Sequence, residues 1–224
     1  MNITIQFMEG EPIFLQTLFT FIKNPSTWLS IASLGIAIWA SFQTKKQIEL
    51  SNKHQLFDRR LKHYLLFKEL LLLYKNGNSL INEDMLILNP ISIYHFLTSS
   101  TIFNRFNRSD NQENVYESDQ IVQIELRRSA IEIELIWNND YGKTAGKFVR
   151  EYVELLDLLH RQEVYLNLIR TKYPDYEERK RNAESFAKEY HLVECVNNIF
   201  KTYIKICDEK IEEKLVKCIE FEAK

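Results

Sequence analysis

The feature that most constrains this chain is an apolar run over residues 25–42 that contains no charged side chain. Eighteen helical residues rise about 27 Å, slightly less than the roughly 30 Å hydrocarbon core of a bilayer. Trp28 and Trp39 fall near the two ends of the run, where membrane proteins place aromatic rings. The run therefore predicts a transmembrane helix over residues 25–43. A buried helix of a soluble protein is the alternative, because the run has the minimum length for a span.

Flanking charge predicts the orientation of this span. Within residues 1–27 one basic residue, Lys23, precedes it, whereas seven follow it within residues 44–68: Lys45, Lys46, Lys53, Arg59, Arg60, Lys62 and Lys68. Excess Lys and Arg marks the cytoplasmic side. We therefore expect a membrane protein with its N-terminus outside and its C-terminal part in the cytoplasm. A cleaved signal peptide would carry its positive charges before the apolar run.

Residues on both sides of the span suggest further contact with the lipid bilayer. Five of the basic residues are expected to rest on anionic headgroups: Lys45, Lys46, Arg59, Arg60 and Lys62. Residues 13–22 form a second apolar run, too short to cross, which is expected to be interfacial, re-entrant or a plug.

Small side chains recur along the span with heptad spacing. They are Ser26, Ser30, Ser33, Ala37, Ala40 and Thr44, spaced 4, 3, 4, 3 and 4 residues apart. Membrane helices approach one another along small residues, because lipid is as apolar as leucine and provides no hydrophobic driving force. We call this set the seam and expect it to mediate homo-oligomerisation. Close packing of a dimer and a narrow pore in an oligomer, taken as a tetramer, both stay open.

The rest of the chain is predicted to be all-α. Five Gly and four Pro accompany 45% hydrophobic and 27% charged residues, which disfavours a turn-rich β-barrel. We expect a segment 1–24, the span 25–43, a stalk helix 44–76 that continues the span, and a cytoplasmic helical bundle 77–224. The stalk is expected to end near Asn76-Gly77-Asn78. Within the bundle, helices are predicted over residues 121–137, 143–172 and 175–222, and an exposed loop over residues 107–119. Heptad spacing predicts the apolar face of the helix 143–172, which consists of Phe148, Tyr152, Leu155, Leu159, Gln162, Leu166 and Ile169.

The stalk sequence Phe57-Asp-Arg-Arg-Leu-Lys-His-Tyr64 resembles a group of bacterial single-span membrane proteins, in which a span leads into a basic helix of this form. The resemblance covers residues 28–73 and concerns architecture. The layout is similar to membrane effectors of anti-phage systems, including the Hailong transmembrane effector family. That family implies an oligomeric channel held shut by a DNA oligomer, although no binding motif of the family matches residues here.

Motifs for catalysis, metals and cofactors are missing, so we expect no enzyme and no cofactor. Gly142-Lys143-Thr144 looks like the end of a phosphate loop, but the earlier glycine of that motif would fall on Trp137. Asp157 and His160 are one turn apart, and a di-metal helical site needs that motif twice. Cys195, Cys207 and Cys218 lack the spacing of a zinc or redox site and are expected to be reduced thiols on a helix.

Basic residues interleaved with aromatic ones form the remaining candidate site. Its predicted nucleotide-binding residues are Arg127, Arg128, Tyr141, Lys143, Lys147 and Arg150, accompanied by Trp137 and Phe148, with Arg105 and Arg108 beside Phe103 and Phe106. Such groups clamp phosphates and stack bases of a nucleotide or short single strand. Solvated helix faces explain them equally well.

Three functions follow from these features. The leading one is an oligomeric effector of the bacterial inner membrane, a ligand-gated channel or membrane-permeabilising protein in anti-phage defence that is controlled by a nucleotide or short oligonucleotide. The second is a membrane-anchored helical scaffold that recruits a regulatory or other cytoplasmic protein partner. The third is a membrane-tethered enzyme without a recognised motif.

The charge asymmetry gives a direct test of topology. A reporter enzyme active only in the cytoplasm, fused after Lys224, is expected to be active, and a reporter active only in the periplasm is expected to be silent at the same position. Recovery of the protein in the soluble fraction without detergent would contradict the membrane assignment.

Overall fold

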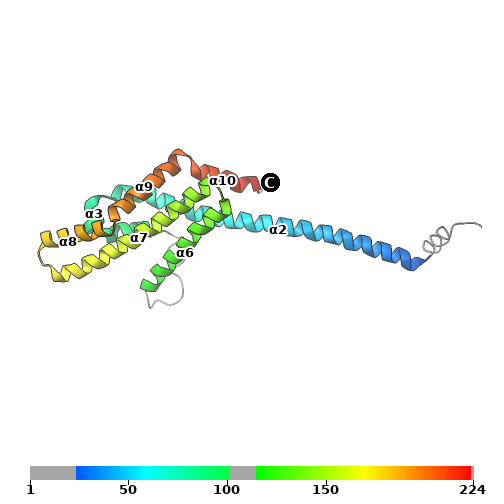
Figure 1. Ribbon diagram of the computed structural model, residues 1–224, viewed down its shortest axis with the longest axis horizontal. Helices are drawn as coiled ribbons and strands as arrows, with labels where there is room; N and C mark the ends of the chain where they lie inside the picture. The colour runs from blue at the N-terminus through cyan, green and yellow to red at the C-terminus, as the bar shows by residue number, and fades with distance from the viewer. Residues whose placement is uncertain (1–23, 101–114, 223–224) are drawn as a thin grey trace, which may run out of the picture. The chain divides into compact units, whose positions relative to one another are not determined.

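The computed structural model describes residues 24–100 and 115–222, and within these residues it consists of helices without strands (Figure 1). The predicted all-α class is confirmed for this part of the chain. The apolar run 13–22 lies outside the described residues, as do Phe103, Arg105, Phe106 and Arg108.

The longest helix, α2, runs from Pro25 to Gly77. The span and the stalk are therefore one continuous helix of 53 residues, as predicted, and it ends at the expected Asn76-Gly77-Asn78 break. The chain divides into two compact units, residues 1–54 and residues 55–224, with the boundary inside α2. We call residues 55–224 the packed unit and describe each unit by itself.

Short helices follow α2 in the packed unit, and polar side chains or prolines mark where they begin. They are the 3-10 helix η1 (Asn78–Leu80), α3 (Glu83–Leu88) and α4 (Pro90–Leu97). The side chain of Asn82 accepts a hydrogen bond from the amide of Met85 at the start of α3. Proline occupies the first turn of α4, where its missing N–H has no helical partner to lose.

Five longer helices make up the remainder: α6 (Val115–Trp137), α7 (Asp140–Lys172), α8 (Tyr176–Glu189), α9 (Leu192–Asp208) and α10 (Ile211–Glu222). The predicted loop 107–119 is corrected, because residues 115–119 belong to α6; the rest of it is outside the described residues. The predicted helical region 175–222 consists of three helices. Each of its two breaks contains a left-handed residue directly before the next helix, His191 at φ 57° and Lys210 at φ 51°.

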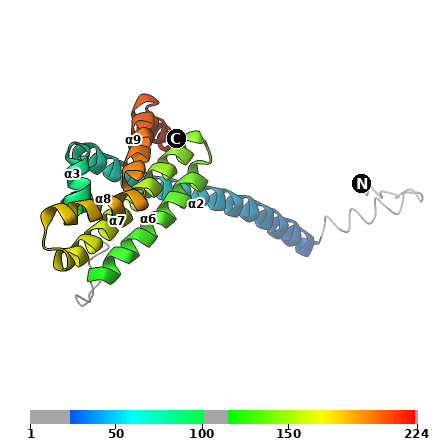
Figure 2. The same cartoon turned by 60° about the vertical axis from the view of Figure 1, so that its left-hand side comes forward.

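Helix α7 is the element on which the packed unit is assembled. All seven heptad positions predicted for its apolar face are buried: Phe148, Tyr152, Leu155, Leu159, Gln162, Leu166 and Ile169. Helices α3, α4, α6, α8, α9 and α10 each contact α7. Both views show α6 running beside α7 (Figures 1 and 2).

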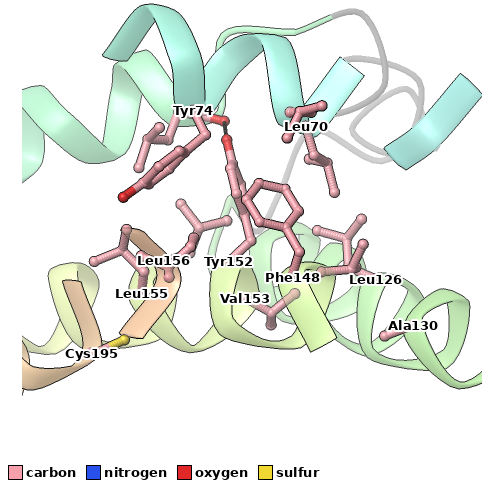
Figure 3. Packing of buried hydrophobic residues seen from close by; sticks show 14 of the residues in the cluster. Leu70, Tyr74, Leu126, Ala130, Phe148, Tyr152, Val153, Leu155, Leu156 and Cys195 are labelled. Atoms are coloured by element: carbon pink, nitrogen blue, oxygen red, sulfur yellow. Dashed lines mark hydrogen bonds between the residues drawn. The ribbon is translucent and has the colours of Figure 1, made fainter. Parts of the chain in front are cut away.

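Aromatic rings join α7 to the C-terminal half of α2. The rings of Phe67 and Tyr74 in α2 each meet the ring of Phe148 edge-on, at centroid distances of 5.9 and 5.8 Å. Figure 3 shows Leu70 and Tyr74 of α2 facing Phe148 and Tyr152 of α7. The ring of Tyr203 in α9 also contacts Tyr74. The C-terminal part of the stalk, from His63 onward, is therefore part of the core of the packed unit.

The pair α6 and α7 approaches closely because α7 carries a glycine at the crossing. A Cβ atom at Gly146 would lie 2.7 Å from the backbone oxygen of Ala130 in α6. That separation is too short for any side chain, and a backbone oxygen in a helix has little room to move. Gly146 therefore sets the distance between the two helices that form the candidate groove described below.

A buried hydrogen bond gives a test of this core. The hydroxyl of Tyr152 donates to the backbone oxygen of Leu97 at a distance of 2.7 Å. Leu97 ends α4, so its carbonyl has no partner within the helix. Removing the hydroxyl with Tyr152→Phe leaves this buried oxygen unpaired and is expected to lower the free energy of unfolding by about 1–2 kcal/mol.

The measurement is the thermal unfolding midpoint of the purified protein in detergent, followed by circular dichroism. Tyr190→Phe is the matched control, because the ring of Tyr190 is 39% exposed and stacks on Phe186. Equal midpoints for both variants would contradict the role of the Tyr152 hydroxyl.

Candidate functional site

The apolar segment of α2, residues 25–42, is exposed on all sides. Within the described residues α2 is the one helix long and apolar enough to cross a membrane, and none of its apolar window is buried. Eight large side chains of the segment are 50–71% exposed: Trp28, Leu29, Ile31, Leu34, Ile36, Ile38, Trp39 and Phe42. A core helix of a soluble domain would bury such side chains against its own chain. The exposure therefore favours an apolar environment outside this chain.

The hydroxyl groups of the seam are bonded within their own helix. Ser30 Oγ donates to the backbone oxygen of Ser26, Ser33 Oγ to that of Ser30, and Thr44 Oγ1 to that of Ala40, each at 2.9 Å. Ser26 Oγ donates to Asn24 Oδ1 at 2.8 Å. Ala37 is exposed as well, so all six seam residues lie on the surface of α2. Paired hydroxyls lower the cost of placing the segment in hydrocarbon.

The five predicted membrane-surface cations do not share one environment. Lys45, Lys46, Arg59 and Lys62 are exposed. Arg60 is half-buried, and its Nη2 donates to the backbone oxygen of Ile136 at 3.2 Å. Ile136 lies in the last turn of α6, where a cation is favourable for the helix dipole. Arg60 therefore joins α2 to α6, a role that sequence spacing does not indicate.

A second polar contact between α2 and α6 lies one turn further along. His63 is buried, and its Nε2 lies 2.8 Å from Oε2 of Glu132. Nε of Arg128 donates to the other oxygen of the same carboxylate at 3.1 Å. Burial lowers the pKa of His63 below its ordinary value of 6.5, although Glu132 opposes this. No local sequence pattern indicates this pair, because 69 residues separate its members.

Three of the predicted nucleotide-binding residues, Arg127, Lys147 and Arg150, line one cavity of about 850 Å³ between α6 and α7. We call it the α6–α7 groove. The structure adds a fourth cation, Arg161, about three turns beyond Arg150 in α7. The remaining lining residues are Ile131, Glu151, Glu154, Asp157 and Leu158.

Carboxylates already hold most of the cations of the groove. Arg150 Nη2 lies 2.8 Å from Glu134 Oε1, Arg161 Nη2 lies 2.8 Å from Asp157 Oδ2, and Lys147 Nζ lies 3.6 Å from Glu151 Oε1. Arg127 forms no ion pair with any residue in the described parts of the chain. The groove has mixed charge, so a phosphate ligand must compete with these carboxylates for the guanidinium groups.

The other three predicted residues do not line the groove. Arg128 pairs with Glu132, and Lys143 Nζ lies 3.6 Å from Asp140 Oδ1. Nζ of Lys214 lies over the ring of Tyr141, 4.4 Å from its centroid.

The expectation that Trp137 and Phe148 stack on a ligand is corrected, because both rings are buried in the core, with exposures of 5% and 0%. Their heptad positions belong to the helix faces that pack together, so these rings stabilise the fold.

Metal and thiol chemistry receives little support from the described residues. Among residues 24–100 and 115–222, no three His, Cys, Asp or Glu side chains are close enough to hold a metal ion. Asp157 pairs with Arg161, and the ring of His160 contacts that of Tyr94.

Burial raises the pKa of the Cys195 thiol to about 12, which keeps it protonated. Cys207 and Cys218 are also free thiols.

Comparison with known proteins gives no match to a protein-family model, to a curated protein or to a solved structure. The resemblance of residues 57–64 to bacterial single-span proteins therefore stays a prediction. The functional proposal rests on the residues and contacts described above.

The burial of His63 beside Glu132 predicts a pH dependence of stability. Because the pKa of His63 is lower in the folded state, the unfolded chain binds a proton more readily below pH 6.5. The contribution of neutral His63 is therefore complete above pH 6.5 and declines as the pH falls below it. The lowered pKa of Glu132 acts only below its own ordinary value of 4.5. The charged groups facing His63 are Glu132, Lys62 and Arg59.

His63→Gln keeps an amide donor for Glu132 and removes the titration. The unfolding midpoint of the unmodified protein is expected to fall more than that of the variant between pH 7.5 and 5.5. His54→Gln, at an exposed position of α2, controls for the loss of any histidine. Parallel pH profiles for the unmodified protein and His63→Gln would refute this assignment.

Proposed function

We propose that this protein is a homo-oligomeric effector of a bacterial inner membrane. In this proposal residues 25–43 cross the bilayer, the packed unit is cytoplasmic, and copies associate through the seam. The observation that carries the proposal is the apolar segment of α2, whose large side chains are exposed on every side. A lipid bilayer would cover apolar side chains on all sides of the helix, whereas a single partner helix would cover the side chains on one face only.

The seam supports self-association and a change in permeability. Its small side chains permit helix backbones to approach closely. In an oligomer of about four copies, the same residues would face a central axis, and the oxygens of Ser30, Ser33 and Thr44 would be available to water there. The large aliphatic and aromatic side chains between the seam positions would face lipid.

The α6–α7 groove supports control by a ligand. Its cations suit a phosphate-bearing ligand such as a nucleotide or short single-stranded oligonucleotide. Arg127 could bind a phosphate group of such a ligand without first breaking an ion pair to a described residue. The ion pair between Arg150 and Glu134 joins α7 to α6, and α6 holds the stalk through Arg60 and His63. A ligand that draws Arg150 away from Glu134 would therefore act on the helix that contacts α2.

This arrangement agrees with the resemblance to anti-phage membrane effectors. In such a role the ligand would bias a closed state, and its loss would open the membrane path. No enzymatic step is part of the proposal.

One observation favours the second function, a membrane-anchored scaffold. The exposed face of α6 carries Ile121, Ile124, Ile131 and Leu135, which are 51–71% exposed, and Ile131 also lines the edge of the α6–α7 groove. Their spacing of 3, 7 and 4 residues is that of a helix seam, and it suits an amphipathic helix of a cytoplasmic protein partner.

The membrane potential distinguishes the two functions. Expression of the protein without a regulator is expected to depolarise the cells and stop growth, because even a narrow aqueous path dissipates the ion gradient. The double variant Ser30→Leu, Ser33→Leu is expected to abolish depolarisation while the protein stays in the membrane, since leucine fills the seam. Ile36→Leu, on the lipid-facing side, is the control and is expected to depolarise the cells normally.

A voltage-sensitive dye provides the measurement, with insertion checked by membrane fractionation. Neutralising Arg127 and Arg150 is expected to change how the path is controlled and to preserve the path itself. Full polarisation during high expression, with insertion confirmed and no co-purifying inhibitor, would eliminate the effector and leave the scaffold.

A further inference from the structure

The heptad phase of the seam continues without interruption into the packed unit. Beyond Thr44 the same alternation of 3 and 4 residues reaches Gln47, Ser51, His54, Asp58, Leu61, Leu65, Lys68 and Leu72. All of these positions lie in α2, which has no break before Gly77. In a helix wound at 3.5 residues per turn these positions would form one stripe, which carries small residues first, then polar residues, and finally leucines.

In the packed unit the leucines of this stripe are exposed. Leu61, Leu65 and Leu72 are 37%, 53% and 48% exposed. The buried positions of the same stretch fall on the remaining faces: His63, Tyr64, Leu66, Phe67, Leu70, Leu71 and Tyr74. Lys68 belongs to the same stripe, and its Nζ is held 3.2 Å from Glu212 of α10. Packing within the chain thus leaves the three leucines in phase with the seam exposed, beside other exposed positions such as Lys62.

We infer that Leu61, Leu65 and Leu72, named here the leucine stripe, pack against the leucine stripe of a second copy of this chain. The inference rests on the proposed membrane span and seam. Two copies anchored in one bilayer with the same orientation present their α2 helices parallel and in register. A 3–4 repeat maintained over many heptads keeps one face in contact when the helices wind around each other in a left-handed supercoil.

The small size of the leucine stripe also favours a second anchored copy over a soluble partner. Three leucines are fewer than a stable interface between freely diffusing proteins requires. Anchoring converts the contact to a nearly intramolecular one, because the seam already holds the copies together at high effective concentration. The polar positions Gln47, Ser51, His54 and Asp58 contribute little burial, but polar residues in a helix seam favour one register.

Disulfide cross-linking in membranes tests this contact in the full-length chain. The three natural cysteines are first replaced by Cys195→Ala, Cys207→Ser and Cys218→Ser, and single cysteines are then introduced. After mild oxidation, Leu65→Cys is expected to give mainly covalent dimer. Arg59→Cys, at an exposed position of the same helix outside the stripe, is expected to give little. Equal cross-linking at both positions indicates random collision and would overturn the inference.

Ala37→Cys separates failure of the inference from failure of the proposed function. Cross-linking at residue 37 without cross-linking at residue 65 leaves the seam intact and refutes the leucine stripe as a contact. Absence of cross-linking at both positions, with insertion confirmed, refutes both.

A second variant tests the same contact in a chain that keeps its three natural cysteines. Leu61→Asn, Leu65→Asn and Leu72→Asn together, in the otherwise natural chain, change only exposed positions and are expected to shift the protein in detergent toward smaller oligomers. An unchanged native mass with an unchanged circular dichroism spectrum would contradict the leucine stripe.

Discussion

The continuous apolar face of α7 is the constraint on which the packed unit depends. Its heptad positions from Phe148 to Ile169 are all buried, and six other helices rest on it. Gln162 shows how completely that face is enclosed. Its Nε2 donates to the backbone oxygens of Ile87 in α3 and Ala183 in α8, at 3.0 and 3.2 Å. A polar side chain within a buried stripe thus joins two helices through their main chains, which fixes their positions more specifically than apolar contact alone.

Helix α6 connects the candidate groove to the stalk. One side of it approaches α7 closely over Gly146, so that Arg150 of α7 reaches Glu134. Its C-terminal turns meet α2 through two polar contacts, from Arg60 to the oxygen of Ile136 and from His63 to Glu132. Both contacts include a buried or half-buried charge-bearing group, so displacing α6 would leave polar atoms without partners at a substantial cost. The groove and the stalk are therefore energetically linked through one helix.

A single helix, α2, serves two different environments. In residues 25–42 large apolar side chains are exposed around the whole helix, whereas beyond Gln55 the large rings of Phe67 and Tyr74 are fully buried in the core of the packed unit. Hydrogen bonds from seam hydroxyls to their own backbone suit the first environment, and ring contacts with Phe148 suit the second. The change occurs where the basic residues lie, which is also where a membrane surface would favour them.

The sequence by itself determined the helical class, the continuous helix to Gly77, the apolar segment and the buried face of α7. Each of these depends on the spacing of side chains within one helix, and helical periodicity is local. Heptad spacing likewise assigned Gln162 to the core in spite of its polarity. The extent of α6 was underestimated, because the polar residues 115–119 look like a loop when their neighbours are unknown.

Only the tertiary structure decided which charged residues come together. Arg127, Lys147 and Arg150 line one groove with Arg161, and carboxylates lie beside most of these cations. Arg60 contacts α6, although its sequence position predicts a membrane-surface cation. The tertiary structure also buried Trp137 and Phe148, which the sequence offered as ligand-stacking rings. These outcomes depend on the distance and rotation between helices. Gly146 and the rings of the core set that geometry, and no periodicity within a single helix encodes it.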